Sequence, residues 1–362
     1  MDFIITTNAH LSFLAALPGQ YPNLSILSLN LATHPRVMDV TSAAVIKWDQ
    51  LLSLSVGGLS VHAFTHIATI PTLSFLSLKI PDTLEMVLPT FLESPFPALR
   101  SIAMHSAELS FSSRLLRLMS PGSALRSICI EGEEDSTAVH TWEDIIRTVV
   151  GTCLSSSLQC LSIEDYKPQN VEIDTAEQEL VLPGNCIRPL LVFKNLTNVC
   201  LRVCHGIDLD DNLLLELAMA LPLIQTLILT SAHKPRLARA TLASFVSFAQ
   251  HCQSMDQLSI TLNARRIPAA PTVKICNPKM RILYVGLSPI RTKNAPKVAA
   301  FLSDLFPNLR TVINRYGDCR EDETDPVTQL DKAWTQVDSL VTLFAGVRAQ
   351  ETRRMKQLPT NG

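Results

Sequence analysis

The chain has 362 residues, of which 47% are hydrophobic and 18% are charged, and this balance excludes an intrinsically disordered chain. Its 31 basic and 33 acidic residues nearly cancel, so the overall charge does not favour nucleic acid or an anionic membrane surface as a partner. No apolar stretch reaches the roughly 18 to 20 residues that span a bilayer. We therefore expect partners that include no nucleic acid and no membrane.

The N-terminal segment, MDFIITTNAHLSFLAALPG, is a poor secretory signal. It has Asp2 where a signal peptide has basic residues, and polar residues interrupt its apolar run. The nine cysteines are scattered without the spacing of a disulfide framework, which favours reduced thiols. These features predict a cytoplasmic or nuclear protein.

A short phrase, L-x-x-L-x-L with Ile, Val or Met allowed at the apolar positions, recurs along the chain. Its copies begin at Leu24, Leu51, Leu73, Leu99, Leu125, Leu158, Leu196, Ile224, Met255, Met280 and Leu309. The alternation of apolar and polar residues predicts a short β-strand at each copy. Most steps between copies fall within roughly 20 to 29 residues, which is the period of leucine-rich repeats.

Segments with helical spacing separate the predicted strands. They are TLEMVLPTFLES, FSSRLLRLMS, TWEDIIRTVVGTC, DDNLLLELAMALP, TLASFVSFAQHC and KVAAFLSDLFP. One strand and one helix cannot bury their apolar sides alone, so we expect successive units to stack around one continuous core. The predicted fold class is therefore α/β, a leucine-rich-repeat solenoid in the form of a horseshoe, with a parallel concave sheet and helices on the convex side.

Four regions are expected along the chain. Residues 1–315 form the leucine-rich-repeat solenoid, with about eleven irregular repeats. Residues 316–326, YGDCREDETDP, form an acidic linker, and residues 351–362 form a disordered basic tail. Between them, apolar residues recur at alternating steps of three and four over 327–350, which predicts an amphipathic helix that caps the last repeat. Heptad pairing of this helix with a second chain is the alternative.

Side chains alternate across a strand, so the residues that flank the inner apolar positions of each phrase should line the concave face. This surface is small and rich in hydroxyl groups, with Phe75 and Tyr284 as its large aromatic anchors. It predicts a surface that docks a folded protein. The candidate partner-binding residues are Ser28, Asn30, Ser53, Ser55, Phe75, Ser77, Ser101, His105, Cys129, Glu131, Ser162, Glu164, Cys200, Arg202, Thr226 and Tyr284.

The sequence contains no Walker loop and no zinc-protease, serine-hydrolase or dinucleotide-binding motif. Cys200, Cys204 and His205 have no second cluster at zinc-finger spacing, so we interpret them as packing residues. His251 and Cys252 end a predicted helix, where a histidine complements the helix dipole. We therefore expect no enzyme, no catalytic residues, no metal site and no cofactor.

Two charged segments leave alternatives open. RRIPAAP, residues 265–271, has the spacing of a ligand for aromatic-lined grooves, but a proline-rich turn between repeats explains it equally well. The acidic run at 131–136, together with Glu164 and Asp165, predicts an acidic rim at the middle of the stack. This rim is either a solvated loop or a docking site for a basic partner.

Several phrases together resemble mushroom-type fungal F-box proteins whose C-terminal part is an irregular leucine-rich-repeat array. The resemblance covers nearly the whole chain and lies in YPNLSILSLNL, IRPLLVFKNLTNVCL, DDNLLLELAMALPLIQTLIL, TLASFVSFAQHCQSMDQLSI, LYVGLSPI with KVAAFLSDLFPNLRTV, and WTQVDSLVTLFAGVRAQE. It implies that the repeats hold a protein substrate while an N-terminal F-box binds the adaptor of a cullin/RING ubiquitin ligase. We recognise no F-box in the N-terminal segment, so adaptor binding is assigned to no residue. Either an N-terminal F-box exists in the full gene, in which case a cullin/RING ligase adaptor is a partner, or the chain is a repeat-only relative of the family.

We accordingly expect a protein–protein interaction scaffold that recognises the substrate of an F-box-type ubiquitin ligase. The alternative is a GTPase-activating or enzyme-inhibitor leucine-rich-repeat protein. That function requires a catalytic arginine or an acidic groove at one rim, and only the patch of Glu131 and Glu164 comes near it. A hydrolase built on cysteine and histidine is a third class, for which the sequence places no pair.

Overall fold

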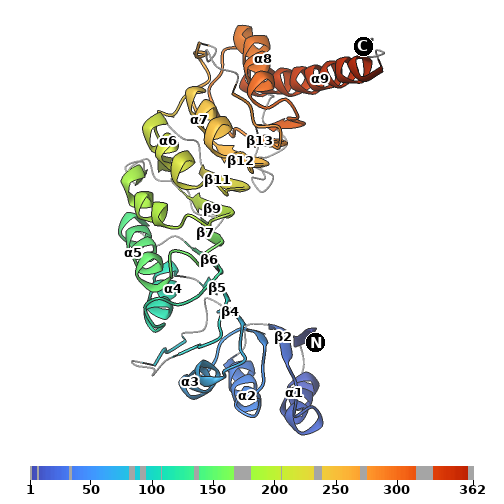
Figure 1. The fold of residues 1–362 in the computed structure, drawn as a ribbon. Coiled ribbons are helices and arrows are strands. Elements are labelled where there is room, and N and C mark those ends of the chain that lie inside the picture. Colours follow the sequence, from blue (N-terminus) through green and yellow to red (C-terminus); the bar gives the residue numbers. More distant parts are fainter. Residues whose placement is uncertain are drawn as a thin grey trace. The chain divides into compact units, whose positions relative to one another are not determined.

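The computed structural model describes residues 2–5, 8–31, 35–80, 86–89, 95–106, 108–133, 138–166, 181–204, 206–231, 239–269, 275–314 and 329–357. Within these residues the chain has an α/β fold in which parallel strands alternate with helices, and the sheet is not closed into a barrel (Figure 1). The chain divides into two compact units, Met1–Glu172 and Ile173–Gly362. No helix in the described ranges combines the length and the apolar character that crossing a membrane requires.

The described part of the first unit contains a parallel sheet whose strands follow one another in chain order. They are β1 (Asp2–Ile5), β2 (Ile26–Leu31), β3 (Ser53–Val56), β4 (Phe75–Lys79), β5 (Ser101–Ser106), β6 (Ser127–Glu133) and β7 (Cys160–Tyr166). The helices of this unit are α1 (Asn8–Gln20), α2 (Pro35–Val45), α3 (Val61–Thr69), α4 (Leu109–Arg117) and α5 (Ala138–Thr152). Strand β1 was not predicted, because it precedes the first copy of the repeated phrase.

The second unit repeats this plan. Its main parallel sheet contains β9 (Asn198–Val203), β11 (Thr226–Ser231), β12 (Gln257–Ile260), β13 (Ile282–Tyr284) and β14 (Thr311–Ile313), and a separate two-stranded sheet pairs β8 (Leu182–Pro183) with β10 (Ile207–Asp208). Its α-helices are α6 (Asp211–Ala220), α7 (Ala243–His251), α8 (Ala295–Leu305) and α9 (Gln329–Gln357). Two 3-10 helices, η2 (Gly184–Val192) and η3 (Thr292–Asn294), also belong to this unit.

The repeated phrase recurs because its apolar residues form buried rows across neighbouring strands. In the first unit one row consists of side chains that are each at most 1% exposed, namely Leu27, Leu54, Leu76, Ile102, Ile128 and Leu161. Burying one such side chain stabilises the fold by about 1.5–3 kcal/mol. Each copy of the phrase therefore packs against the next copy, as expected for stacked repeats.

One predicted helix is wrong in the part that the structure describes. The segment TLEMVLPTFLES was expected to be helical, but its described residues Met86–Pro89 are irregular. Pro89 explains the difference, because a proline in a helix interior removes a backbone hydrogen bond and clashes with the preceding turn.

Helix α9 covers the last strand of the second unit. It packs against α8 and β14, and its Asp338 Oδ1 accepts a hydrogen bond from the Val312 backbone N–H at 2.6 Å. Thr342 Oγ1 donates to the Arg310 carbonyl at 3.1 Å. These side chains satisfy backbone groups at the sheet edge, which would otherwise be open to pairing with another chain.

Helix α9 also continues beyond the predicted end at residue 350. Residues 351–357 are helical through Gln357, although the tail from 351 onward was expected to be disordered. The reason is that every residue of this stretch except Thr352 is a strong helix former, namely glutamate, arginine, methionine, lysine or glutamine. The predicted acidic linker at 316–326 and the last residues, 358–362, lie outside the described residues.

Candidate functional site

The candidate site is the face of the first unit's sheet that its helices leave uncovered, called the open face below. In β3 and β5, buried and half-buried residues alternate strictly, so one face of the sheet is core and the other is accessible. Helices α4 and α5 lie on one side of the neighbouring strands, as Figure 1 shows. The open face consists of the outward residues of β2–β7.

In the first unit, the residues predicted for the concave face fall into three register rows of the open face, one of which contains His105, Glu131 and Glu164. In-register pairing aligns one row across β2–β7, formed by Ser28, Ser55, Ser77, Ala103, Cys129 and Ser162. A second row contains Ser53, Phe75, Ser101, Ser127 and Cys160. Most of these side chains are half-buried, but Ser77 is buried. For Asn30 only the backbone is described, and it pairs with Ile4 of β1.

The sequence prediction missed several open-face residues, among them the exposed Ile26, which pairs with Ser53, and the exposed Lys79, which pairs with His105. Ala103, Ser127 and Cys160 occupy the same rows as their predicted neighbours. The strand alternation that found the other members also identifies these three, since each is two residues from a predicted position or from another member of its strand.

Polar and titratable side chains gather at the β5–β7 end of the open face, in a group called the β5–β7 cluster. It consists of His105, Cys129, Glu131, Ser162 and Glu164. His105 Nδ1 and Glu131 Oε2 lie 2.8 Å apart, and Ser162 Oγ donates to Glu164 Oε1 at 3.1 Å. Cys129 Sγ lies 3.8 Å from Glu131 Oε1. Strand register places His105, Glu131 and Glu164 side by side on three successive strands.

The β5–β7 cluster does not activate its thiol. Burial, reinforced by the negative charges of Glu131 and Glu164, raises the pKa of Cys129 from 9.0 to about 11. A thiol with this pKa is protonated at neutral pH, and the thiolate is the nucleophilic form. Among the described residues, no group of three or more histidine, cysteine, aspartate or glutamate side chains is arranged to hold a metal ion.

The predicted acidic rim is wrong in one of its members. Asp165 is buried, and its Oδ2 accepts a hydrogen bond from Trp142 Nε1 at 2.6 Å. The cause is strand alternation, which turns Glu164 to the open face and Asp165 toward helix α5. Of the acidic run at 131–136, only residues 131–133 are described, and the Glu131 carboxylate is already shared with His105.

The four predicted residues of the second unit lie on its main sheet. Cys200 and Tyr284 belong to one register row, Cys200, Ile228, Ser259 and Tyr284, while Thr226 pairs with Asn198 and Gln257, and Arg202 with Thr230. Ile228 was missed, although its position between Cys200 and Ser259 follows from the alternation. Cys204 is buried, and His205 lies outside the described residues.

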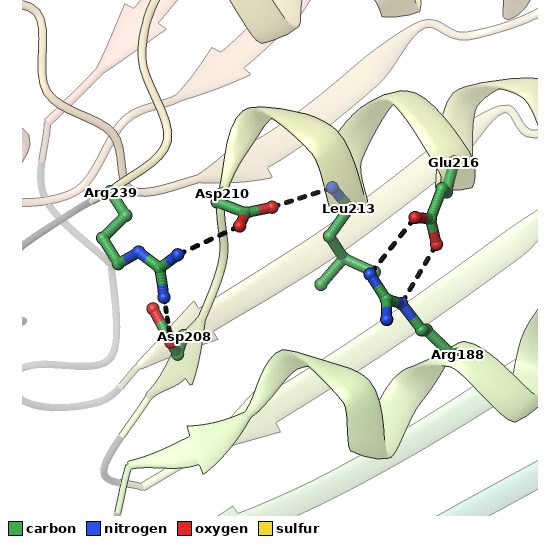
Figure 2. Close-up of polar contacts among 6 residues, drawn as sticks. All are labelled: Arg188, Asp208, Asp210, Leu213, Glu216 and Arg239. Carbon is green, nitrogen blue, oxygen red and sulfur yellow. Dashed lines mark hydrogen bonds and ion pairs between the residues drawn. The ribbon is translucent and has the colours of Figure 1, made fainter.

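The acidic residues around helix α6 cap that helix and form ion pairs, as Figure 2 shows. Asp210 caps α6 by accepting from the Leu213 backbone N–H at 2.9 Å, and it also pairs with Arg239 at 3.1 Å. Arg239 contacts Asp208 at 2.7 Å as well. These contacts fasten the segment that precedes α7 to β10 and to the start of α6.

No protein-family model and no curated protein matches the chain. The open face is an accessible surface that the repeats build, because alternate residues of its strands are half-buried. This surface has hydroxyl, thiol, imidazole and carboxylate groups in register, and its Cys129 thiol has a raised pKa.

Proposed function

We propose that the chain is a leucine-rich-repeat solenoid of the horseshoe type that serves as a protein–protein interaction scaffold, with the open face as the wall that holds the partner. One observation carries the proposal. The row that contains Ser28, Ser55 and Cys129 runs in register across β2–β7 on the side of the sheet opposite the buried leucine row. A regular, half-exposed surface of this kind presents repeated hydrogen-bonding groups to a folded protein.

The partner is held by shape and hydrogen bonding. Serine hydroxyls both donate and accept, so a row of them matches the backbone and polar side chains of a partner without a strong charge requirement. Phe75 is the aromatic anchor of the open face, since aromatic side chains dominate the energetics of protein interfaces. Its half-buried ring lies between Ser53 and Ser101 in the register.

Within this general function, the specific role that we propose is substrate recognition for an F-box-type ubiquitin ligase. The resemblance of the repeat phrases to mushroom-type F-box proteins supports this role. It assigns the substrate to the repeats and leaves the contact with the ligase adaptor to an F-box outside the recognised repeats.

The scaffold is proposed to be noncatalytic. The grouping closest to a catalytic arrangement is Cys129 with His105 and Glu131, and there His105 contacts the carboxylate while the thiol has a raised pKa. A nucleophilic cysteine needs the opposite shift. The enzyme-inhibitor alternative loses support too, because Asp165 is buried against Trp142 and does not contribute to an acidic groove.

The test is affinity purification of the tagged full-length gene product from cells that express it, followed by reconstitution with each purified partner. The variant S55R/S101R places two long cationic side chains on the open face. The matched control, H62R/T69R, places the same charges at exposed positions of helix α3. Thermal melting should show that both variants remain folded.

We expect a protein partner that binds the wild type and the control saturably and is lost from the open-face variant. Equal binding by all three chains would overturn the assignment of the open face. The ligase role has its own readout, which is copurification of a cullin/RING adaptor in all three samples. If the adaptor is absent while the open-face variant still loses its partner, the scaffold function stands and the ligase role is wrong.

A further inference from the structure

The second unit contains a strongly basic stretch of sequence. Between Asp256 and Asp304 there is no acidic residue, although there are eight basic ones, which are Arg265, Arg266, Lys274, Lys279, Arg281, Arg291, Lys293 and Lys297. The whole chain has nearly equal numbers of the two signs, 31 basic and 33 acidic. This stretch is therefore a local exception to the charge balance.

Five of these residues gather at the end of the sheet where strands β12 and β13 finish, in a group called the basic cluster. Arg265 and Arg266 follow β12, Arg291 and Lys293 follow β13, and Lys297 lies in the first turn of α8. All five are exposed. Because β12 and β13 are parallel neighbours, the segments that follow them emerge at the same edge of the sheet.

Hydrogen bonds hold the two segments together. The Ala264 backbone N–H donates to the Pro289 carbonyl at 2.9 Å, and Asn294 Nδ2 donates to the Arg265 carbonyl at 2.9 Å. Asn294 directly follows Lys293 in the chain, so its amide brings the cations of the two segments close together. The basic cluster is thus built on a fixed backbone.

No carboxylate in the described ranges neutralises the basic cluster, since none of its five side chains forms an ion pair there. Other arginines of the same unit do have such partners. Arg188 pairs with a glutamate at 3.0 Å, while Arg239 and Arg348 pair with aspartates at 2.7 and 2.9 Å. Helix α9 packs against η3, which contains Lys293, and it carries an aspartate, Asp331, near its start. This carboxylate is buried and accepts a hydrogen bond from Asn314.

We propose that the basic cluster binds an acidic polypeptide segment of a protein partner. The like charges gathered there are relieved by clustered carboxylates, and the guanidinium groups of Arg265, Arg266 and Arg291 match carboxylates with two parallel hydrogen bonds. The proposal rests on the proposed function only in that the ligand is a protein. Its residues belong to the second unit, whereas the open face belongs to the first.

Two other polyanions fit the surface less well. Single-stranded nucleic acid is bound where basic groups alternate with aromatic side chains on which bases stack, and neither 261–269 nor 286–294 contains an aromatic residue. A membrane-surface site pairs cations with large apolar side chains that insert into the lipid. Of the large aliphatic side chains directly next to these cations in the chain, Ile267 and Ile290 are half-buried and Val298 is buried.

The experiment measures fluorescence anisotropy of a labelled oligoglutamate peptide titrated with the full chain. The test variant is R265Q/R266Q/R291Q. The control variant, K279Q/R281Q/R310Q, removes the same number of exposed charges from the opposite end of the strands in the same unit. A conservative variant, R265K/R266K/R291K, keeps the charge and removes the guanidinium geometry.

We expect the test variant to bind the peptide at least about tenfold more weakly than the wild type, and the control variant to bind within about twofold. The lysine variant should fall between them, since it keeps the Coulomb attraction but not the paired hydrogen bonds. Raising the salt from about 0.1 M to about 1 M should weaken wild-type binding, because the screening length falls from about 10 Å to about 3 Å.

Three outcomes would overturn the proposal. The first is equal binding of the peptide by the test and control variants. The second is tighter binding of a single-stranded oligonucleotide or of an anionic vesicle than of the peptide, and the third is peptide binding that appears only after the acidic residues of 316–326 are changed to amides. The last outcome would assign the cluster to the chain's own acidic segment. Failure here leaves the open-face experiment unaffected, since that experiment changes only residues of the first unit.

Discussion

Trp142 on helix α5 donates its indole N–H to Asp165 on strand β7, with 2.6 Å between Nε1 and Oδ2. Both side chains are buried. The bond therefore joins the helix of one repeat to the strand that follows it, across the helix–sheet interface. Buried polar groups are costly when they lose a partner, so this pair orients α5 on the sheet.

We predict that D165A lowers the free energy of unfolding by about 1–3 kcal/mol, because it leaves the buried indole N–H without its acceptor. D165N should cost less, since the amide oxygen still accepts a hydrogen bond. Urea unfolding followed by circular dichroism measures both. E164Q, on the same strand but on the open face, is the control, and an equal loss for E164Q and D165A would contradict the prediction.

Trp334 anchors helix α9 to the second unit. Its side chain is fully buried, and its Nε1 donates to the Ser288 carbonyl at 2.7 Å. W334A should lower the free energy of unfolding by about 3–5 kcal/mol through cavity formation. L343A changes a side chain of the same helix that is 59% exposed, so it should change stability by less than about 0.5 kcal/mol.

Hydrogen exchange supplies a second readout for this pair of variants. Asp338 of α9 bonds to a backbone N–H of β14 and Thr342 bonds to the carbonyl just before that strand, so loosening the helix should expose β14. W334A should therefore speed amide exchange in Thr311–Ile313, while L343A should not. Unchanged exchange in W334A would show that β14 is protected without α9.

The sequence was sufficient to predict the strands that carry the repeated phrase. The period of the phrase and its alternation identify the buried row and most of the open face, because a strand with one buried face must alternate. Prediction was poorer where the signal is not periodic. Strand β1 has no copy of the phrase, and at Met86–Pro89 a single proline outweighed the apolar spacing.

The polar contacts could not be predicted in the same way. Glu164 and Asp165 are adjacent acids in the sequence, but only strand direction decides that one is accessible and the other binds Trp142. The basic cluster was missed because its residues follow two different strands and lie far apart in the sequence. Only the contact between the two segments, in which Asn294 bonds to Arg265, brings them together. Net charge, which is −2 for the whole chain, averages such a group away.

Asp210 has two partners, and each makes a separate prediction possible. It caps helix α6 through the Leu213 N–H, and it pairs with Arg239 (Figure 2). D210A should lower the free energy of unfolding by about 1 kcal/mol through loss of the cap. R239Q should cost less, because exposed ion pairs contribute about 0–1 kcal/mol. If R239Q proved the more harmful change in urea unfolding, the ion pairs would be the larger contribution.

Two buried thiols should make the protein sensitive to alkali. Burial raises the pKa of Cys153 and of Cys252 from 9.0 to about 12. Below about pH 9 both thiols are protonated in the folded and unfolded states, so they do not change stability. Above it the unfolded chain loses their protons and the folded chain keeps them, so stability should fall by up to about 1.4 kcal/mol per pH unit for each thiol.

Urea unfolding between about pH 8 and about pH 11 measures this slope. C252A should reduce it, although it lowers stability at every pH through lost packing. C276A removes a half-buried thiol and is the control. It should leave the fall of the free energy of unfolding with pH unchanged. A slope in C252A equal to that of the wild type would show that Cys252 does not contribute to the alkaline loss.

Cys129 offers a chemical test of the β5–β7 cluster. Burial, and after it the charges of Glu131 and Glu164, raise its pKa, the hydrogen bond with Ser162 lowers it, and together these effects bring the pKa to about 11. Iodoacetamide reacts with the thiolate, so Cys129 should be alkylated slowly at about pH 8 and faster as the pH rises toward its pKa. Mass spectrometry of the peptide that contains Cys129 gives the rate for this thiol alone.

Two substitutions should move the rate of Cys129 alkylation in opposite directions. E131Q removes a negative charge beside the thiol, lowers its pKa and should speed alkylation at a fixed pH. S162A removes the bond that favours the thiolate, raises the pKa and should slow it. Both effects should be smaller than that of unfolding in urea, because burial is the largest cause of the shift. Fast alkylation of folded wild type at about pH 8 would mean that the thiol is activated, and the open face would then have to be reconsidered as a reaction site.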